Sequence, residues 1–216
     1  MGFSDLFSRR RKDNTDTDAG ASDAPAHPTK ALPKFLATLG QRPQPLLLDL
    51  GPVVGQTLTF FGEQLGCKIF VEDLAKDIDR HAKEGKPEHP DAFFAQRFPQ
   101  ETGSFDGILC WDLFDFIDKT SGQALAKQLS RILRPDGALL AFFNTVEPVQ
   151  GAKPHYTRYV VTDPAHLQHR PYPGQQPRLK PLNNRDIQRM FEPLRITEQF
   201  LLKSTMREVL FRKSAA

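Results

Sequence analysis

Acidic side chains lie at three points where apolar stretches of this chain end. Asp49 closes a run of leucines, and Glu72 and Asp73 follow the next apolar run. Asp112 follows a third such run. Carboxylates can accept hydrogen bonds from an ammonium group or from sugar hydroxyls, and one of them can act as a general base. If the apolar runs are parallel strands, these side chains meet at one edge of a sheet, where ligands bind.

The turn after Asp49 narrows the class of ligand. Residues 49–55 read DLGPVVG, so that Gly51 lets the backbone approach a ligand and Gly55 lets a helix begin close to the strand. A dinucleotide site requires a glycine where Val53 stands, and a phosphate-binding loop requires a lysine that this turn lacks. A carboxylate beside bound phosphates is also electrostatically unfavourable. The turn therefore favours a ligand with an amino-acid part and a nucleoside part, although Asp49 can also serve as a turn or capping residue.

The elements that must position these residues alternate between strands and helices. The run at 46–50 predicts a strand buried on both faces, and the apolar stripe Leu58, Phe61 and Leu65 predicts a helix over 56–65. Further predicted strands cover 67–71, 92–98, 105–111 and 138–143, further helices cover 32–39, 73–82, 120–133 and 184–191, and 195–203 pairs with 207–212 as a hairpin. We therefore expect a Rossmann-like α/β fold: a seven-stranded, mostly parallel sheet with helices on both faces and the last strand antiparallel.

The chain of 216 residues has room for one substantial domain. Residues 1–30 are expected to form a disordered N-terminal tail, since Asp, Thr, Ala, Pro and Ser dominate most of it. Residues 31–216 form the domain, in which the proline-rich stretch 144–182 is a lid or acceptor-binding insertion. The net charge of +3 is too small to imply a polyanionic partner, and no apolar run has the ~20 residues of a transmembrane helix. Cys67 and Cys110 lie at strand-like positions, which indicates buried free thiols and a cytoplasmic location.

The first residues of the tail allow two interpretations. Phe3, Leu6 and Phe7 share one helical face ahead of the basic cluster 9–12, which is typical of a weak interfacial anchor. A solvated, disordered tail is the alternative, because so short a segment does not form a stable helix in water. Weak membrane association of the tail therefore stays open.

Residues 151–190 carry an excess of positive charge. Asp163 and Asp186 stand against the basic residues Lys153, Arg158, Arg170, Arg178, Lys180, Arg185 and Arg189. Such a stretch can bind a carboxylate, a phosphate or nucleic acid, and solvated loop charge is the alternative. No metal is expected, because His155, His166 and His169 lack metal-ligand spacing with any Cys or acidic partner.

Taken in order, these segments resemble the class I S-adenosylmethionine-dependent methyltransferases over about residues 45–212. The matching segments are the acidic residue with its glycine-rich turn, the strand ending in an acidic pair, a Ser-Phe-Asp run and a Pro-Gly turn: Asp49–Gly55, Gly66–Leu74, Ser104–Ile108 and Leu133–Gly137. The resemblance implies S-adenosylmethionine as the cofactor and methyl transfer to an acceptor that the sequence does not identify.

The resemblance also implies roles for individual residues. The expected cofactor contacts are Asp49, Gly51, Gly55, Glu72, Asp73, Gln96 and Trp111. Asp73 follows Gly51 at about the ~20-residue spacing at which an acid meets ribose hydroxyls, and it also suits a helix N-cap. Gln96 is expected to hydrogen-bond adenine. Asp112 is expected to be the catalytic base, with a solvated loop carboxylate as the alternative.

The acceptor and the activity leave alternatives open. The acceptor is a small molecule or a macromolecule, with an anionic acceptor as one option, and a nucleic-acid partner is not expected. The alternative to an enzyme is a non-catalytic methyltransferase-like module that binds a partner, a membrane or RNA. Its cofactor site would be degenerate, because Val53 stands where the family often has glycine.

Overall fold

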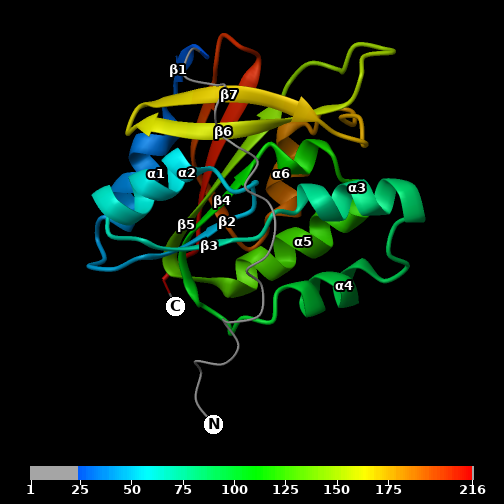
Figure 1. Cartoon of the computed structure of the whole chain (residues 1–216). Coiled ribbons are helices and arrows are strands. Elements are labelled where there is room, and N and C mark those ends of the chain that lie inside the picture. Colours follow the sequence, from blue (N-terminus) through cyan, green and yellow to red (C-terminus); the bar gives the residue numbers. More distant parts are fainter. Residues whose placement is uncertain (1–23, 216) are drawn as a thin grey trace.

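A six-stranded sheet forms the centre of the fold in the computed structural model, which describes residues 24–215 (Figure 1). In spatial order its strands are β3 (Lys68–Val71), β2 (Leu46–Asp49), β4 (Phe105–Trp111), β5 (Leu133–Asn144), β9 (Met206–Arg212) and β8 (Arg195–Leu201). The first four are parallel, β9 is antiparallel to β5, and β8 is antiparallel to β9. The predicted α/β class, the mostly parallel sheet and the antiparallel last strand are confirmed.

The strand predicted at 92–98 is a helix instead. α4 (Pro90–Arg97) begins with a proline, which suits the first helical position, and it buries Phe94 four residues before the equally buried Phe98. This helix packs against α5 (Lys119–Ile132). The sheet therefore ends at β3, and the expected count of seven strands is wrong.

Helices cover both faces of the sheet, as predicted. The remaining helical elements are α1 (Ala31–Leu39), α2 (Gly55–Thr59), η1 (Phe60–Gln64), α3 (Ala75–Glu84), η2 (Leu113–Asp115) and α6 (Asn184–Met190). One apolar core lies between the sheet and α1 with η1, around Phe35 and Phe61. The second lies on the opposite face, where α3, α4, α5 and α6 pack around residues such as Phe114 and Leu129 (Figure 1).

The first helix after the glycine turn changes its winding. α2 makes little more than one turn, and the chain continues as the π-helical turn η1. The wider turn shifts the phase of the apolar positions, so that Phe60 and Phe61 are buried whereas Leu65 is exposed. Of the predicted stripe, only Phe61 is fully buried.

The stretch expected to be an irregular lid contains a hairpin. β6 (His155–Asp163) pairs with β7 (His166–Pro173), and β1 (Ala26–Pro28) adds a third antiparallel strand. This second sheet lies across one end of the central sheet (Figure 1). Because β1 falls within the predicted tail, the folded part begins ahead of residue 31. The anchor residues of the tail lie outside the described residues, so disorder and membrane association there stay predictions.

A buried carboxylate fastens the start of α1 to the central sheet. Glu208 of β9 is 1% exposed, and its Oε2 accepts hydrogen bonds from the backbone N–H groups of Lys30 (2.8 Å) and Ala31 (2.7 Å). A carboxylate at a helix N-terminus also interacts favourably with the helix dipole. This contact therefore holds α1 and the neighbouring β1 in place.

Both cysteines are buried free thiols, as predicted. Burial raises the pKa of the Cys67 thiol to about 11, which leaves it protonated and unreactive at neutral pH. No helix within residues 24–215 is long and apolar enough to cross a membrane. The cytoplasmic location stays a prediction.

Candidate active site

The ends of three neighbouring strands bring predicted site residues together. Asp49 is the last residue of β2, Asp112 directly follows β4, and Asp73 follows β3 by two residues. β2 lies between the other two strands in the sheet. The Asp73 charge contributes to a raised pKa at Asp49, so these two carboxylates interact electrostatically. The parallel strands thus gather acidic groups at one edge, at the point where the strand order reverses.

Asp49 is a buried hydrogen-bond acceptor within this edge. Its Oδ1 accepts the backbone N–H of Gly51 at 2.9 Å and the indole Nε1–H of Trp111 at 2.7 Å. Burial raises the pKa of Asp49 to about 6, although both hydrogen bonds act in the opposite direction. The carboxylate is therefore satisfied by the chain itself.

The indole of Trp111 lies directly against the glycine turn. A Cβ built on Gly51 would come within 2.9 Å of the indole Cδ1 and Nε1 atoms. On its other side the indole stacks on Tyr159 of β6, with ring centroids 5.1 Å apart and planes inclined by 8°. The space beside Gly51, where a close-approaching ligand is expected, is thus filled by a side chain of the protein.

Asp112 and Asp115 form a buried acidic pair at the end of β4. The Tyr159 hydroxyl donates a hydrogen bond to Asp112, and the backbone and side-chain N–H groups of Asn144 donate to Asp115 Oδ2 at 2.9 and 2.6 Å. Burial, assisted by the Asp115 charge, raises the pKa of Asp112 to about 7. Burial also raises the pKa of Asp115 to about 6, against the effect of these bonds and of Arg178. Asp112 is only 7% exposed, so it is not a solvated loop carboxylate.

Only a small cavity remains at this edge. Its volume is about 30 Å³, and Gly51, Trp111 and Asp112 line it together with Tyr156 and Tyr172 of the hairpin. That volume holds about two water molecules, whereas sites for small organic ligands have ~300–1,000 Å³. The described conformation therefore closes the part of the site next to Gly51.

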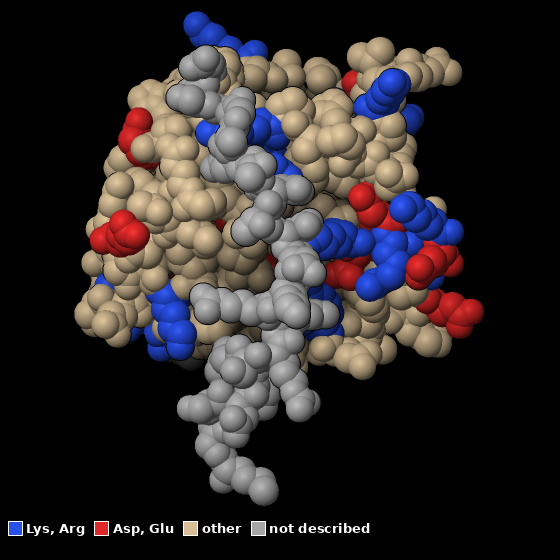
Figure 2. Space-filling model, in the orientation of Figure 1, with Lys and Arg blue, Asp and Glu red and all other residues tan. Residues whose placement is uncertain are grey.

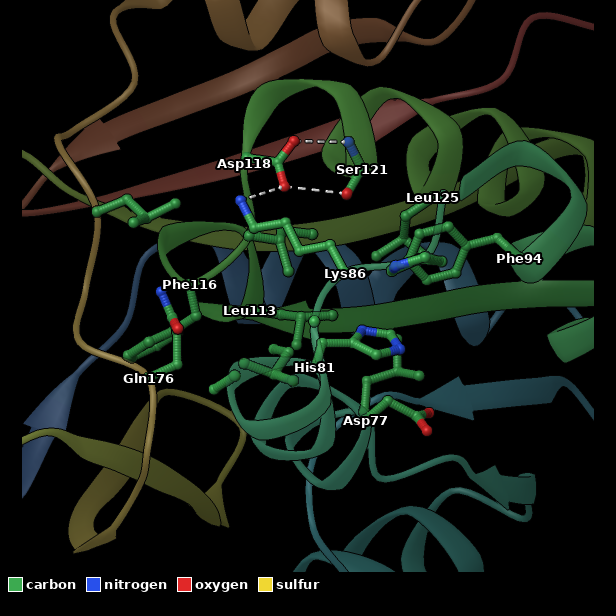
Figure 3. Close-up of a pocket in the computed structure, with 17 residues that line it drawn as sticks. Asp77, His81, Lys86, Phe94, Leu113, Phe116, Asp118, Ser121, Leu125 and Gln176 are labelled. Carbon is green, nitrogen blue, oxygen red and sulfur yellow. Dashed lines mark hydrogen bonds and ion pairs between the residues drawn. The ribbon is translucent and has the colours of Figure 1, made fainter. Parts of the chain in front are cut away.

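A larger cavity of about 280 Å³ lies one side-chain layer away, between α3 and α5 (Figure 3). Its walls are mainly apolar and include Leu74, Ile78, Phe94, Leu113, Phe116 and Leu125. Ile78, Leu113 and Phe116 also line the small cavity, so the two spaces share a wall. At the rim the Asp118 carboxylate pairs with Lys86 at 3.0 Å (Figure 3). Walls of this kind suit the apolar part of a ligand.

Asp73 is engaged at the start of α3. Its Oδ1 accepts the backbone N–H of Ala75, the first residue of the helix, at 3.2 Å, and its Oδ2 lies 3.6 Å from Lys76 Nζ. The N-cap residue of α3 is Leu74 rather than Asp73, so Asp73 contacts the first turn of the helix from one residue further out.

Five predicted site residues line neither cavity. Two of them, Asp49 and Asp73, are described above, and the other three are Glu72, Gln96 and Gly55. Glu72 forms an ion pair with Arg97 at 2.6 Å. Gln96 is exposed on α4 and lines neither cavity, because the predicted strand that would have carried it to the sheet edge is a helix. A Cβ on Gly55 would meet no atom within 4 Å, so the close approach expected there does not occur.

The basic residues of 151–190 have different surroundings: Lys180 Nζ lies 3.7 Å from a Glu147 carboxylate oxygen, whereas Arg170 is hydrogen-bonded to Gln168. Figure 2 shows Lys and Arg atoms at several places on one face of the molecule, some of them beside Asp and Glu atoms. Two arginines nevertheless face the site: Arg178 acts electrostatically on Asp112, and Arg158 lies over the Tyr172 ring at 4.8 Å. The Arg158 Nε is buried and has no hydrogen-bond partner among the described residues.

Two residues of the site carry no role in the sequence prediction. Tyr159 connects the indole with Asp112, and Asp115 raises the pKa of Asp112. The only sequence signals for them are an aromatic-rich lid and an acidic run after β4, and neither signal singles out these positions.

Comparisons with known proteins identify one matching family. The sequence profile described as "Methyltransferase domain" matches residues 22–192. No curated protein matches the sequence.

Among solved structures, the chain is similar to 1,6-didemethyltoxoflavin-N1-methyltransferase of Burkholderia thailandensis, with 17% identity, 86% of this chain and 77% of that chain covered, and a TM-score of 0.47. An S-adenosylmethionine-dependent methyltransferase of Clostridium acetobutylicum is 14% identical, and the match covers 79% of this chain and 84% of that chain with a TM-score of 0.48. A type 11 methyltransferase of Sulfolobus solfataricus, described as putative in its name, has 11% identity, 88% and 95% coverage, and a TM-score of 0.45. Because the family profile covers most of the sequence, the chain belongs to the methyltransferase domain family, a class of S-adenosylmethionine-dependent enzymes.

Proposed function

We propose that this protein methylates an acceptor that loses a proton during transfer, and that Asp112 is the base. The observation that carries the proposal is the Asp112 carboxyl itself. It is buried at the end of β4, lines the cavity next to Gly51, and has a pKa of about 7. A general base works best when its pKa lies near the operating pH. S-adenosylmethionine supplies the methyl group when it is bound.

The larger cavity supports a site for the adenine of the cofactor. Leu74 directly follows Asp73, while Leu113 and Phe116 follow Asp112, so the cavity adjoins both strand ends. Its apolar walls suit the faces of a purine. Asp73 lies at the start of α3 beside Leu74, which is compatible with the predicted contact to ribose hydroxyls.

The methionine end of the cofactor does not fit the described conformation. The indole of Trp111 lies against Gly51, and only about 30 Å³ stays free beside it. The two ends of the expected site therefore differ: the apolar end is open and the polar end is closed.

Three neighbouring side chains influence how Asp112 takes up a proton. The ionised carboxylate can take a proton at one of its oxygens, and the Tyr159 hydroxyl fixes its orientation by a hydrogen bond. The neighbouring Asp115 opposes ionisation of Asp112, whereas Arg178 favours it. The hairpin that carries Tyr159 also limits the space for water at this edge of the sheet, because its Tyr156 and Tyr172 line the small cavity.

We further propose that the acceptor is anionic. The buried Arg158 Nε has no hydrogen-bond partner among the described residues, and the guanidinium lies over Tyr172, which lines the small cavity. A carboxylate or phosphate offers the acceptor oxygens that such a group lacks. Replacing Arg158 by lysine keeps the charge but removes the planar donor set, so this variant separates charge from geometry.

Calorimetric titration with S-adenosylhomocysteine and with adenosine tests the cofactor site. We expect both ligands to bind, and we expect His81→Trp, which fills the larger cavity, to weaken both by at least about tenfold, or about 1.4 kcal/mol. Lys83→Trp is the matched control, because Lys83 is exposed on the same helix and does not line the cavity. If neither ligand binds to the wild-type protein, the result contradicts the proposal and favours a non-catalytic module.

A further inference from the structure

The single tryptophan of the chain adopts an unusual backbone conformation at the edge of the candidate site. Trp111 has φ +50°, in the left-handed region that bulky residues rarely occupy. Such a conformation persists only when the surroundings hold it, and it concentrates at functional positions. The residue is 5% exposed although it ends a strand beside a potential ligand site.

Three contacts hold the indole in this position. Its Nε1–H donates to Asp49 at 2.7 Å, its face stacks on Tyr159, and its edge meets the Phe142 ring at 5.6 Å between centroids. Tyr159 belongs to the hairpin rather than to the central sheet. The indole thus connects the two sheets beside the glycine turn at Gly51.

The position of the indole and the expected position of the cofactor's methionine end exclude each other. A single added carbon on Gly51 would already lie 2.9 Å from the indole. The Asp49 carboxylate, the acceptor expected for the ligand's amino group, already receives the indole N–H at its Oδ1. The indole must therefore leave this space, and give up its bond to Asp49, before that end of the cofactor can bind.

We propose that Trp111 is the gate of the donor site: its indole occupies the methionine subsite in the free protein and leaves when the cofactor binds. This inference rests on the proposed function. The ligand can displace the indole because its ammonium group and the Asp49 carboxylate are both charged, so an ion pair is added to the hydrogen bond, whereas the indole N–H is neutral. Such a difference in affinity between the two states is what shifts the equilibrium toward the open state.

Opening the gate also changes the surroundings of the base. The Tyr159 ring loses its stacking partner when the indole leaves, and the same tyrosine carries the hydroxyl that bonds to Asp112. Cofactor binding therefore removes one ring contact between hairpin and sheet next to the base, while the contact of Tyr159 with Phe142 of β5 stays in place. In this way occupation of the methionine subsite prepares the neighbouring space for an acceptor.

Fluorescence of the wild-type protein tests the gate directly, because Trp111 is the only tryptophan. Saturating S-adenosylhomocysteine should shift its emission to longer wavelength and increase its quenching by acrylamide. Adenosine lacks the amino-acid end, so it should bind in the larger cavity without either change. S-adenosylhomocysteine that binds and leaves both signals unchanged would overturn the gate while the proposed cofactor site stands.

Affinities of two variants give an independent measurement. Trp111→Ala should bind S-adenosylhomocysteine about tenfold more tightly than wild type, as for a gate that is closed in about nine molecules of ten. Its affinity for adenosine should stay the same. Trp111→Phe, which keeps an aromatic ring but loses the N–H donor, should lie between the two.

The outcomes separate the gate from the function on which it rests. Weaker binding of S-adenosylhomocysteine by Trp111→Ala would make the indole a cofactor contact and overturn the gate. If neither ligand binds to wild type or to either variant, the proposed function itself fails. Circular dichroism checks that the variants fold, and the wild-type fluorescence decides the question should Trp111→Ala not fold.

Discussion

Replacing Asp112 by asparagine should stabilise the protein at alkaline pH while it removes the base. The pKa of Asp112 is about 7 in the folded protein, compared with an ordinary value of 3.8. The folded state binds the Asp112 proton more tightly than the unfolded state does, so protonation of Asp112 stabilises the folded protein. This stabilisation is complete below the ordinary pKa of 3.8 and is lost as the pH rises through the folded pKa of about 7. A difference of about three pKa units corresponds to about 4 kcal/mol.

Asparagine avoids this loss because it cannot ionise, and its oxygen still accepts a hydrogen bond from the Tyr159 hydroxyl. At about pH 8 we expect Asp112→Asn to have a free energy of unfolding about 2–4 kcal/mol above that of the wild type. At about pH 4 the two proteins should agree within about 1 kcal/mol, since Asp112 is then protonated in the folded wild type and half-protonated in the unfolded chain. Urea unfolding across this range measures the difference.

Glu101→Gln is the control, because it removes an exposed carboxylate and should leave the pH dependence unchanged. In the same preparation of Asp112→Asn, methyl transfer to a proton-losing acceptor should fall by about 10²–10⁴-fold. Parallel pH–stability curves for wild type and Asp112→Asn would refute the reasoning. They would mean that the Asp112 carboxyl ionises in the folded protein as easily as in the unfolded chain.

Three further substitutions probe the contacts around the site. Gly51→Ala should lower the free energy of unfolding by about 1–3 kcal/mol and redshift the tryptophan emission, because its Cβ meets the indole, whereas Gly55→Ala, which meets no atom, should do neither. Glu208→Gln should lower the free energy of unfolding in thermal melts by about 1–3 kcal/mol, since it replaces two charge-assisted bonds to the start of α1 by weaker ones; an unchanged melting temperature would contradict this. Asp79→Asn should speed hydrogen exchange in the segment after β7, because the charged Asp79 Oδ1 accepts the backbone N–H of Gln175 at 2.9 Å, and should leave exchange in α5 unaltered.

The sequence allowed the parallel core to be predicted because its signals are local. An uninterrupted apolar run ending at Asp49 indicates a strand buried on both faces, and the strand Phe105–Trp111 matches its prediction at both ends. The error at 92–98 has a local cause as well. Two adjacent phenylalanines favour a strand by propensity, but burial of Phe94 and Phe98 on one helical face against α5 prevails.

The state of the site depends on contacts that no local pattern encodes. The position of the Trp111 indole depends on its positive φ and on Tyr159, which lies on another sheet. The hairpin itself was not predicted, because prolines and polar residues dominate its sequence and hide the inward-facing tyrosines. The sequence therefore indicates which residues reach the edge of the sheet, but it does not indicate that Trp111 fills the space beside Gly51.

The difference between the two ends of the site has a physical cause. A buried carboxylate without hydrogen-bond donors is strongly destabilising, so an empty space beside Asp49 would be unfavourable unless water or the protein supplied donors. The Gly51 N–H supplies one donor, and closing the gate adds the indole N–H of Trp111 as a second donor to Asp49 Oδ1 in the free protein. The cavity between α3 and α5 needs no hydrogen-bond donors, since its walls are mainly apolar and an apolar cavity can stay empty. A gate is therefore needed at the polar end alone, and the ligand that opens it must bring a donor of its own for Asp49.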